Sequence, residues 1–362
     1  HNPVIASSET TPPDFRDPKV FWCAPADCWM MSVAGPERIE FWSSHNLTDW
    51  HFESQFGADH GVHGVQWECP DLRRMPIDGN PLETCWVLIV SVNPGAPNGG
   101  SGTMYFVGDF SAVDGQWQFI SHHTEPSWLD WGCDNYAHVG WAGLEDSDFG
   151  ERVLSIGWMN NWNYATTLPT APWRGCMTLI RELAVQTFGA DLCLTARPAP
   201  FYDELMGATL AGGEGALKEP VLNRRMDIGA GLATSLIDVH LAELDAQEVG
   251  VELSNDDGDL VRIGYLPGTG FFVDRTAAGE CFHEQFAGHH IAATAQLYRQ
   301  IQIEIYLDRC SVEVFFNGGE FSMTELIFPT APLTHVKPYA RGQSELVSAA
   351  ITEIGAIRIT GQ

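Results

Sequence analysis

Hydrophobic and polar positions alternate along this chain in short segments. Apolar runs such as CWVLIVSV (85–92), TMYFVGDF (103–110) and RVLSIGW (152–158) are separated by clusters of Gly, Pro, Asn and Asp. Segments of this length, bounded by turn residues, are typical of β-strands, and no long helical period occurs before about residue 185. The pattern predicts an all-β fold: a propeller, a sandwich or a barrel.

The pattern changes after residue 185. The stretch 197–220 is rich in Pro, Gly and Ala, as expected of a junction. Residues 299–328 then alternate with a period of two, which predicts an antiparallel hairpin of a β-sandwich with a turn at Asn317-Gly318. The apolar positions of this hairpin are Ile301, Ile303, Ile305, Leu307, Val312, Val314 and Phe316. We therefore expect one β domain at 1–185, a linker at 186–205 and a β-sandwich at 206–362.

Charge narrows the choice of partners. The 362 residues carry a formal charge of −28, and 44% of them are hydrophobic, enough for a substantial core. Such a surface repels phosphate backbones and anionic lipid, so we expect neither nucleic acid nor membrane as a partner. No stretch resembles a membrane-spanning helix or a signal peptide. A neutral ligand such as a sugar is favoured.

Cysteine and histidine patterns indicate no metal or cofactor. The nine cysteines contain no CxxC pair, and Cys23 and Cys28 are near enough to bridge, although buried free cysteine is common. His60 and His63 lie in the glycine-containing stretch HGVHG, where ordinary loop histidines are expected rather than a metal pair. The segment PGAPNGGSG (94–102) lacks the GK[ST] ending of a phosphate loop, so turn chemistry explains it better.

Two carboxylates stand in unusual surroundings. In FRDPKVFW (15–22), Asp17 follows Arg16, whose guanidinium is expected to keep the carboxylate ionised. In VQWECPDL (65–72), Glu68 lies between Trp and Cys, where desolvation is expected to raise its pKa towards that of a general acid. Each could alone be structural, as a turn cap or a strand-end charge. Together they are the ionised and protonated pair that cleavage of a glycosidic bond requires.

Seven stretches taken in order resemble glycoside hydrolase family 32, whose members include invertases, exo-inulinases, levanases and fructosyltransferases. The resemblance implies a five-bladed β-propeller followed by a C-terminal β-sandwich, and a retaining mechanism at a β-linked fructofuranoside. The stretches are FRDPKVFW (15–22), WECPDL (67–72), SVNPGAPNGGSGTMYFVGDF (91–110), LDWGCDNYA (129–137), GWMNNWNYATTLPTAPWRGCMTLIREL (157–183), FFVDRT (271–276) and SVEVFFNGG (311–319).

The resemblance also implies catalytic roles for individual residues. Asp17 matches the aspartate that holds the fructose hydroxyls and stabilises the transition state, and Arg16 matches the neighbouring arginine that contacts the same sugar. Glu68 matches the acid/base, which protonates the leaving oxygen and then activates water or an acceptor sugar.

Three further residues are expected as substrate-binding neighbours. Trp158 matches a tryptophan near the fructose pocket. Asp134 and Tyr136, in the DNYA segment, are expected at the second shell or the rim.

The family's nucleophile is an aspartate in a WMNDPNG-like motif upstream of the RDP segment, and it has no match in this sequence. The segment WMNNWN (158–163) has Asn161 where the aspartate would stand, and an amide cannot form the glycosyl ester. We therefore expect the first blade to be absent from this chain and its nucleophile to come from a separate N-terminal polypeptide. A truncated, inactive form is the other explanation.

The sequence thus predicts a β-fructofuranosidase-type enzyme acting on sucrose, inulin or levan. A fructosyltransferase, including one that forms difructose anhydrides, shares the same fructosyl-enzyme, and a non-catalytic fructan-binding module is the alternative from another class. Linkage preference, oligomeric state and localisation stay open, with an extracellular location favoured.

Overall fold

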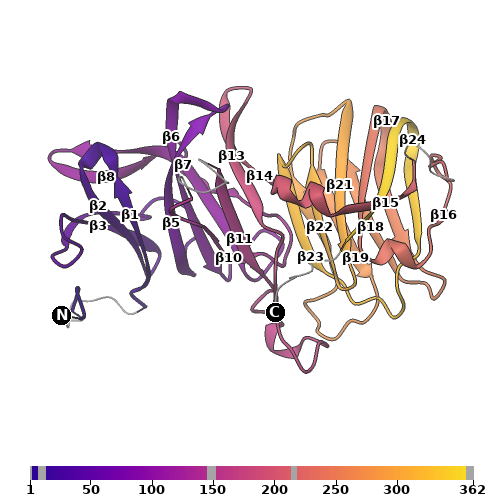
Figure 1. Cartoon of the computed structure of the whole chain (residues 1–362), viewed down its shortest axis with the longest axis horizontal. Coiled ribbons are helices and arrows are strands. Elements are labelled where there is room, and N and C mark those ends of the chain that lie inside the picture. The colour runs from indigo at the N-terminus through magenta and orange to yellow at the C-terminus, as the bar shows by residue number, and fades with distance from the viewer. Residues whose placement is uncertain (1, 7–13, 145–151, 213–217, 356–362) are drawn as a thin grey trace. The chain divides into compact units, whose positions relative to one another are not determined.

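The computed structural model describes residues 2–6, 14–144, 152–212 and 218–355, and nearly all of its regular elements are strands (Figure 1). The chain divides into two compact units. The first consists of residues 1–129, 135–158 and 182–195, and the second of residues 130–134, 159–181 and 196–362. Among the described residues, no helix has the length and apolar character needed to cross a membrane.

The strands of the first unit belong to two sheets. One sheet has the order β1-β2-β3-β4, and a second, ten-stranded one contains β5-β6-β7-β8 and β10-β11-β13-β14, joined by a parallel bridge between Val185 and Ile77. The elements of the first sheet are β1 (Arg16–Cys23), η1 (Ala24–Ala26), β2 (Cys28–Gly35), β3 (Arg38–Ser44) and β4 (His51–Phe56). Those of the second are β5 (Gln66–Ile77), β6 (Asn80–Asn93), β7 (Gly102–Val113), β8 (Gln116–Ser121), β9 (Ser127–Trp128), β10 (Tyr136–Gly140), β11 (Val153–Met159), β12 (Cys176–Met177), β13 (Arg181–Phe188) and β14 (Asp191–Pro198), with η2 (Ala165–Thr167) between β11 and β12.

Local sequence explains the hairpins of this unit. The β5–β6 and β7–β8 turns contain Asp78-Gly79 and Asp114-Gly115, and all four residues have positive φ. Asp-Gly pairs tolerate this conformation, and its twist matches the flanking strands. The apolar runs expected at 85–92, 103–110 and 152–158 form the centres of β6, β7 and β11, as predicted.

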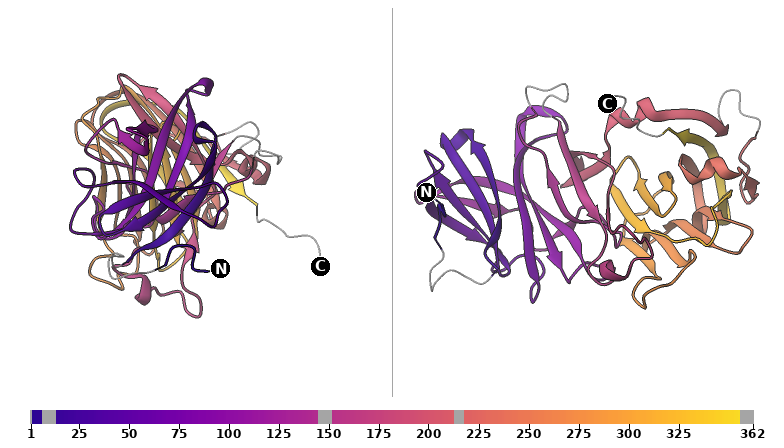
Figure 2. Two further views of the ribbon diagram at one scale, coloured as in Figure 1. Left: turned by 90° about the vertical axis from the view of Figure 1, so that its left-hand side faces the viewer. Right: turned by 60° about the horizontal axis from the view of Figure 1, so that its bottom comes forward.

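The β1–β4 sheet has two unlike faces. Phe21, Met30 and Phe41 lie on the face that packs into the core shared with β5–β8. The opposite face carries a row of cross-strand partners, Val20, Met31, Trp42 and Phe52, beside the paired Trp22 and Trp29. Val20, Trp22 and Phe52 are 37%, 49% and 46% exposed, so this second face is an exposed apolar surface. The backbone of the β1–β4 sheet is drawn in indigo in Figure 2 (left).

The second unit is a β-sandwich whose strands follow the order β20-β19-β18-β17-β21-β22-β23, with β24 pairing along β17. Its apolar positions fill one core, including every apolar position that the alternation of residues 299–328 predicted. Asn317 and Gly318 both have positive φ, in the turn that the sequence predicts. Its elements are η3 (Pro200–Leu205), β15 (Met206–Ala211), β16 (Met226–Asp227), η4 (Ala230–Ala233), β17 (Ser235–Ser254), β18 (Leu260–Leu266), β19 (Gly270–Ala277), β20 (His289–Ala293), β21 (Gln300–Asp308), β22 (Ser311–Phe316), β23 (Phe321–Leu326) and β24 (His335–Ile354).

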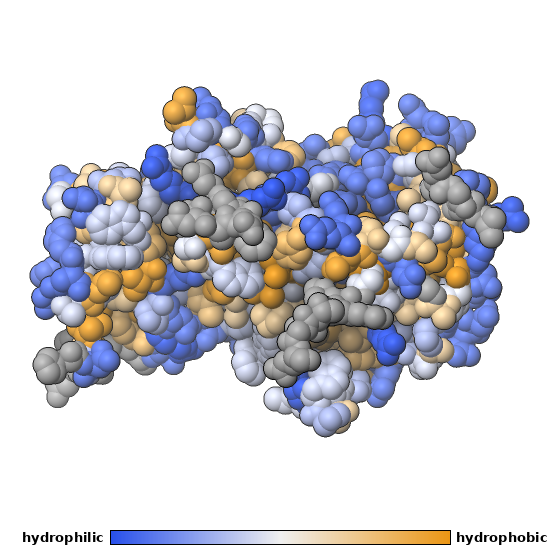
Figure 3. All heavy atoms as spheres, viewed as in Figure 1, coloured by the Kyte–Doolittle hydropathy of each residue, from blue (hydrophilic) through white to orange (hydrophobic). Residues whose placement is uncertain are grey.

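The stretch expected as a linker, 186–205, is regular structure: it holds the end of β13, all of β14 and η3. Segments 130–134 and 159–181 also group with the second unit rather than with their sequence neighbours. Hydrophilic side chains cover much of the surface in view, as the large negative charge leads one to expect (Figure 3).

Candidate active site

Three strands of the first unit depart from regular pairing at the residues singled out from the sequence. Register shifts fall between Arg16 and Lys19 in β1, between Glu68 and Asp71 in β5, and between Tyr136 and Val139 in β10. Each irregularity contains a non-glycine residue with positive φ, namely Asp17 (58°), Cys69 (49°) and Ala137 (52°). Such conformations are uncommon and cost energy, and bulges of this kind redirect side chains next to functional sites.

The first two irregularities meet. The backbone N–H of Cys69 donates a hydrogen bond of 3.0 Å to Asp17 Oδ2, and the Cys69 thiol lies 3.6 Å from the same oxygen. Burial, reinforced by the negative charges of Asp17 and Glu68, raises the pKa of the Cys69 thiol to about 12. Cys69 is therefore a neutral S–H donor, and it fixes Asp17 beside the backbone that carries Glu68.

Glu68 is held from two sides. Arg16 donates from Nη2 and Nε to Glu68 Oε1 at 2.6 and 3.1 Å, and Tyr136 donates its hydroxyl to Oε2. The Glu68 carboxylate raises the pKa of Arg16 in return. This differs from the expectation that Arg16 would act on Asp17: the guanidinium reaches across to β5, because the bulge at Asp17 turns that carboxylate towards Cys69.

Trp158 completes the group. It pairs with Tyr136 across β10 and β11, and the two rings lie edge to face with centroids 6.4 Å apart. The structure thus brings together Arg16, Asp17, Glu68, Tyr136 and Trp158 within the first unit.

Asp71 supports this group from behind and was not singled out from the sequence. Its buried carboxylate accepts hydrogen bonds from the Gly140 N–H (2.8 Å) and from Arg73 Nε (3.1 Å), and Lys19 Nζ lies 3.6 Å away. Lys19 also donates to the Gly140 carbonyl at 2.7 Å. Asp71 therefore ties together β1, β5 and β10, each at the end of its irregular segment. Its place directly after the Cys69-Pro70 pair in the same motif was the available signal.

Asp134, expected as a substrate-binding neighbour at the second shell or the rim, lies elsewhere. It is fully buried in the second unit, where Arg275 Nη1 lies 2.5 Å from Oδ2 and the Tyr164 hydroxyl donates to Oδ1 at 2.6 Å. The Leu326 N–H also donates to Oδ2. With both oxygens occupied inside the protein, Asp134 is a structural anion.

Asn161 is structural as well. It is buried, and its amide donates to the Cys133 carbonyl at 2.8 Å while its oxygen accepts from the Asn163 N–H. The WMNNWN segment therefore supplies a loop anchor in the second unit.

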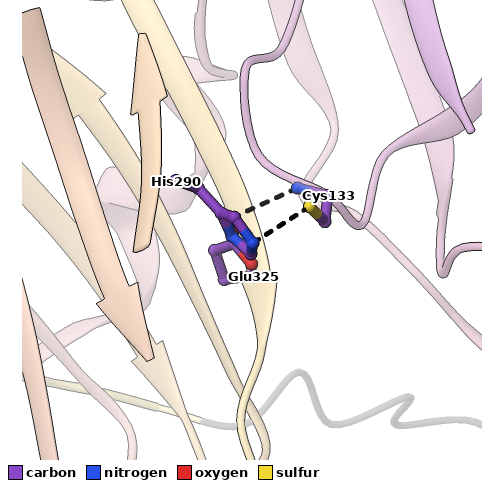
Figure 4. Close-up of side chains that lie close together, drawn as sticks. All are labelled: Cys133, His290 and Glu325. Atoms are coloured by element: carbon purple, nitrogen blue, oxygen red, sulfur yellow. Dashed lines mark hydrogen bonds and ion pairs between the residues drawn. The ribbon is translucent and has the colours of Figure 1, made fainter. Parts of the chain in front are cut away.

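Among the described residues, Cys133, His290 and Glu325 form one group with the spacing of metal ligands (Figure 4). His290 Nδ1 lies 2.7 Å from Glu325 Oε1, and its Nε2 lies 3.4 Å from Cys133 Sγ. Burial raises the pKa of the Cys133 thiol well above its ordinary value, so beside His290 it is a neutral hydrogen-bonding group. Arg275, 2.9 Å from Glu325 Oε2, already supplies a positive charge. The chemistry of the group is that of an internal hydrogen-bond network rather than of a metal site.

Two further pairs considered from the sequence, His60 with His63 and Cys23 with Cys28, form neither a metal site nor a disulfide among the described residues. His60 packs on the Phe56 ring, whereas His63 lies 3.0 Å from Glu37 Oε2. Cys23 and Cys28 face each other across β1 and β2 as free, buried thiols.

Strands arranged in propeller-type sheets, with a glutamate and an aspartate held in one site, are compatible with the class of glycoside hydrolases. Comparison with known proteins agrees. Residues 1–196 match the model of the glycosyl hydrolases family 32 N-terminal domain, and residues 216–353 match that of the family's C-terminal domain. The chain belongs to glycosyl hydrolase family 32, and its fold is the β-propeller followed by a β-sandwich that the resemblance implied.

Characterised relatives cover nearly the whole chain. It is 34% identical over 360 residues to a levanase of Bacillus subtilis, covering 94% of this chain and 50% of that protein. It is 33% identical to an extracellular exo-inulinase of Aspergillus awamori, with 98% and 68% covered. The crystal structure of exo-inulinase from Aspergillus awamori superposes with a TM-score of 0.83 at 30% identity, over 98% of this chain and 71% of that one. The present sequence thus spans half the length of the levanase.

Proposed function

We propose that this chain carries the acid/base and the sugar-binding half of a retaining β-fructofuranosidase acting on sucrose, inulin or levan. The observation that carries the proposal is the contact between the two bulges, which holds the Asp17 carboxylate on the backbone N–H of Cys69, next to Glu68. Levanase and exo-inulinase are the names of its relatives, which supports fructans as the substrate class.

Glu68 acts as the general acid and then the general base. Arg16 and Tyr136 orient its carboxylate by holding one oxygen each. Each oxygen keeps a second lone pair, and the side chain is partly exposed, so a substrate can still reach it. Proton transfer to the glycosidic oxygen and later removal of a proton from water require one group to serve in both directions, as in other retaining glycosidases.

Asp17 accepts hydrogen bonds from the fructose hydroxyls and stabilises positive charge on the ring in the transition state. The Cys69 N–H and thiol occupy Oδ2, so Oδ1 is the oxygen proposed for the sugar. Trp158 offers a half-buried indole face next to Tyr136, suited to the apolar side of a furanose ring.

That an aspartate on a separate N-terminal polypeptide supplies the nucleophile stays a prediction. The exposed apolar face of the β1–β4 sheet supports it, because β1 begins at Arg16 and a sheet packed on Val20 and Trp22 would lie beside the site. Mass spectrometry of the purified enzyme tests it: two polypeptide species are expected, and a single species without activity on sucrose would contradict it.

The proposed function is tested by Glu68→Gln in the intact enzyme, with the exposed Glu83→Gln as the matched control. We expect Glu68→Gln to lower kcat/KM on sucrose by roughly 10²–10⁴-fold, the range for general acid catalysis. The loss should be much smaller on β-fructosyl fluoride, whose leaving group needs no protonation. Equal losses on both substrates, or near-parental activity on sucrose, would show that Glu68 is not the acid.

Product analysis separates the alternatives. Incubation with sucrose and with levan should release free fructose. Fructose oligomers or difructose anhydrides in its place would identify a transferase, and binding without products would identify a non-catalytic module.

A further inference from the structure

A groove of about 490 Å³ crosses the outer face of the β-sandwich where β17, β21 and the β22–β23 turn lie side by side. It lies wholly within the second unit, and nothing in the proposed site uses it. Its lining includes His240, Gln302, Asn317, Arg299 and Tyr298.

The floor of the groove is a single row of polar side chains. His240 on β17 is the cross-strand partner of Gln302 on β21. The Asn317 N–H donates to the Gln302 carbonyl, and the Gln302 N–H donates to the side-chain Oδ1 of Asn317 in the turn. Residues opposite one another on antiparallel strands present their side chains to the same face. The row therefore offers the His240 imidazole and the Gln302 side-chain amide to one ligand, whereas the Asn317 amide is held by Gln302 and Glu320.

These groups are oriented but not saturated. Asp238 Oδ1 accepts from Gln302 Nε2 at 3.1 Å and lies 3.4 Å from His240 Nε2, which leaves Gln302 Oε1 and His240 Nδ1 without partners among the described residues. Glu320 accepts from the Tyr298 hydroxyl and from Asn317 Nδ2 at 2.6 and 3.2 Å. Both carboxylates therefore hold the row from outside the groove.

The sides of the groove are formed by two exposed apolar side chains and one arginine. Leu297 and Val347 flank the row and are 71% and 58% exposed. The exposed Arg299 makes no ion pair or side-chain hydrogen bond among the described residues. Neutral planar donors and acceptors between apolar ridges suit a molecule with hydroxyl groups and C–H faces.

We propose that this groove is a second carbohydrate-binding site, which holds a neutral oligosaccharide stretch away from the catalytic residues. The acidic groups behind the row, and the formal charge of −28, disfavour an anionic ligand. That the oligosaccharide is a stretch of fructan rests on the proposed function.

The test uses Arg299→Ala combined with Gln302→Ala in the full enzyme. The parallel control is Arg225→Ala, an exposed arginine on the same unit whose partner is the exposed Asp256. Initial rates are measured on sucrose and on inulin, and binding is measured by electrophoresis in gels containing soluble inulin or levan.

The double variant should show a KM for inulin raised about fivefold or more, from the loss of the hydrogen bonds that Gln302 and the charged Arg299 would donate to the sugar. Its kinetics on sucrose should be unchanged, and its retardation in the polysaccharide gels should be reduced, while the control matches the parent. Parental KM and parental retardation in the double variant would overturn the proposal, as would an equal loss on sucrose.

The two proposals fail separately. If the parent enzyme releases no product from any fructoside, the proposed function fails, whereas gel retardation lost only in the double variant still supports the groove.

Discussion

Glu304 is an ionisable group whose burial should make stability depend on pH. It lies on β21 between its cross-strand partners Asp238 on β17 and Phe315 on β22. Burial, with the negative charge of Asp238 as the next cause, raises the pKa of Glu304 from 4.5 to about 7. Its carboxylate has no hydrogen-bond partner among the described residues, so the neutral substitution Glu304→Gln removes the charge at little cost.

The sign follows from proton linkage. In the unfolded chain the carboxyl ionises near pH 4.5, but in the folded protein it holds its proton until about pH 7. Between pH 4.5 and about pH 7 the folded state binds more protons than the unfolded state. The free energy of unfolding therefore falls as the pH rises through this range, and it stays low at higher pH. At 1.36 kcal/mol per pKa unit, the difference amounts to about 3 kcal/mol.

We therefore expect Glu304→Gln to stabilise the protein by up to about 3 kcal/mol at pH 8 and to have almost no effect at pH 4. Urea unfolding followed by circular dichroism at both pH values measures this, with the exposed Glu345→Gln as a control for removing one negative charge. A stability gain that is the same at pH 4 and pH 8, or that Glu345→Gln reproduces, would refute the reasoning.

Three further predictions concern the site and its support. Tyr136→Phe removes a hydrogen bond to the Glu68 carboxylate, so kcat should fall roughly 10- to 100-fold, the range for a hydrogen bond to a charged group. The acid limb of the pH–rate profile should also move. An unchanged pH–rate profile would argue against positioning of Glu68 by Tyr136. Because the pKa of its thiol is raised to about 12, Cys69 should react with iodoacetamide at pH 8 far more slowly than the exposed Cys281. Peptide mass spectrometry measures both rates. Equal rates would contradict the buried environment of Cys69 beside Asp17 and Glu68. Arg275→Met leaves buried carboxylates without their cation and should cost roughly 3–5 kcal/mol of unfolding free energy, measured by denaturant titration; a cost below about 1 kcal/mol would contradict this ion pairing.

Local patterns were sufficient to predict the strands. The runs at 85–92, 103–110 and 152–158 and the alternation from Ile301 to Phe316 all became strands, and apolar residues of the first, second and fourth lie in the two cores. The alternation was readable because the two faces of β21 differ in burial, whereas the continuous apolar runs of β6 and β7 reflect strands that are buried on both faces.

The linker prediction shows the limit of composition. Residues 186–205 lack a strong alternating pattern, yet β14 lies there and pairs with β13. Backbone hydrogen bonds to a neighbouring strand can order a sequence whose own preference is weak.

The site was found from sequence in part. The motifs identified Asp17, Glu68, Tyr136 and Trp158 as candidate site residues. In the structure these residues lie close together. Arg16 was expected beside Asp17, and Asp134 beside the substrate, but bulge geometry and the buried charge of Arg275 assign them to other partners.

The sequence by itself determined the all-β class, the positions of several strands, the turn at Asn317-Gly318 and the residue types of the proposed site. Only the tertiary structure decided which carboxylate pairs with which cation, as for Asp130 with Arg181 and Asp134 with Arg275. It also decided that segments 130–134 and 159–181 belong to the sandwich unit. The physical reason is the distance along the sequence over which each feature is determined. Side-chain alternation is a property of adjacent residues. Asp134 and Arg275, in contrast, are 141 positions apart and become partners only when folding removes both from water.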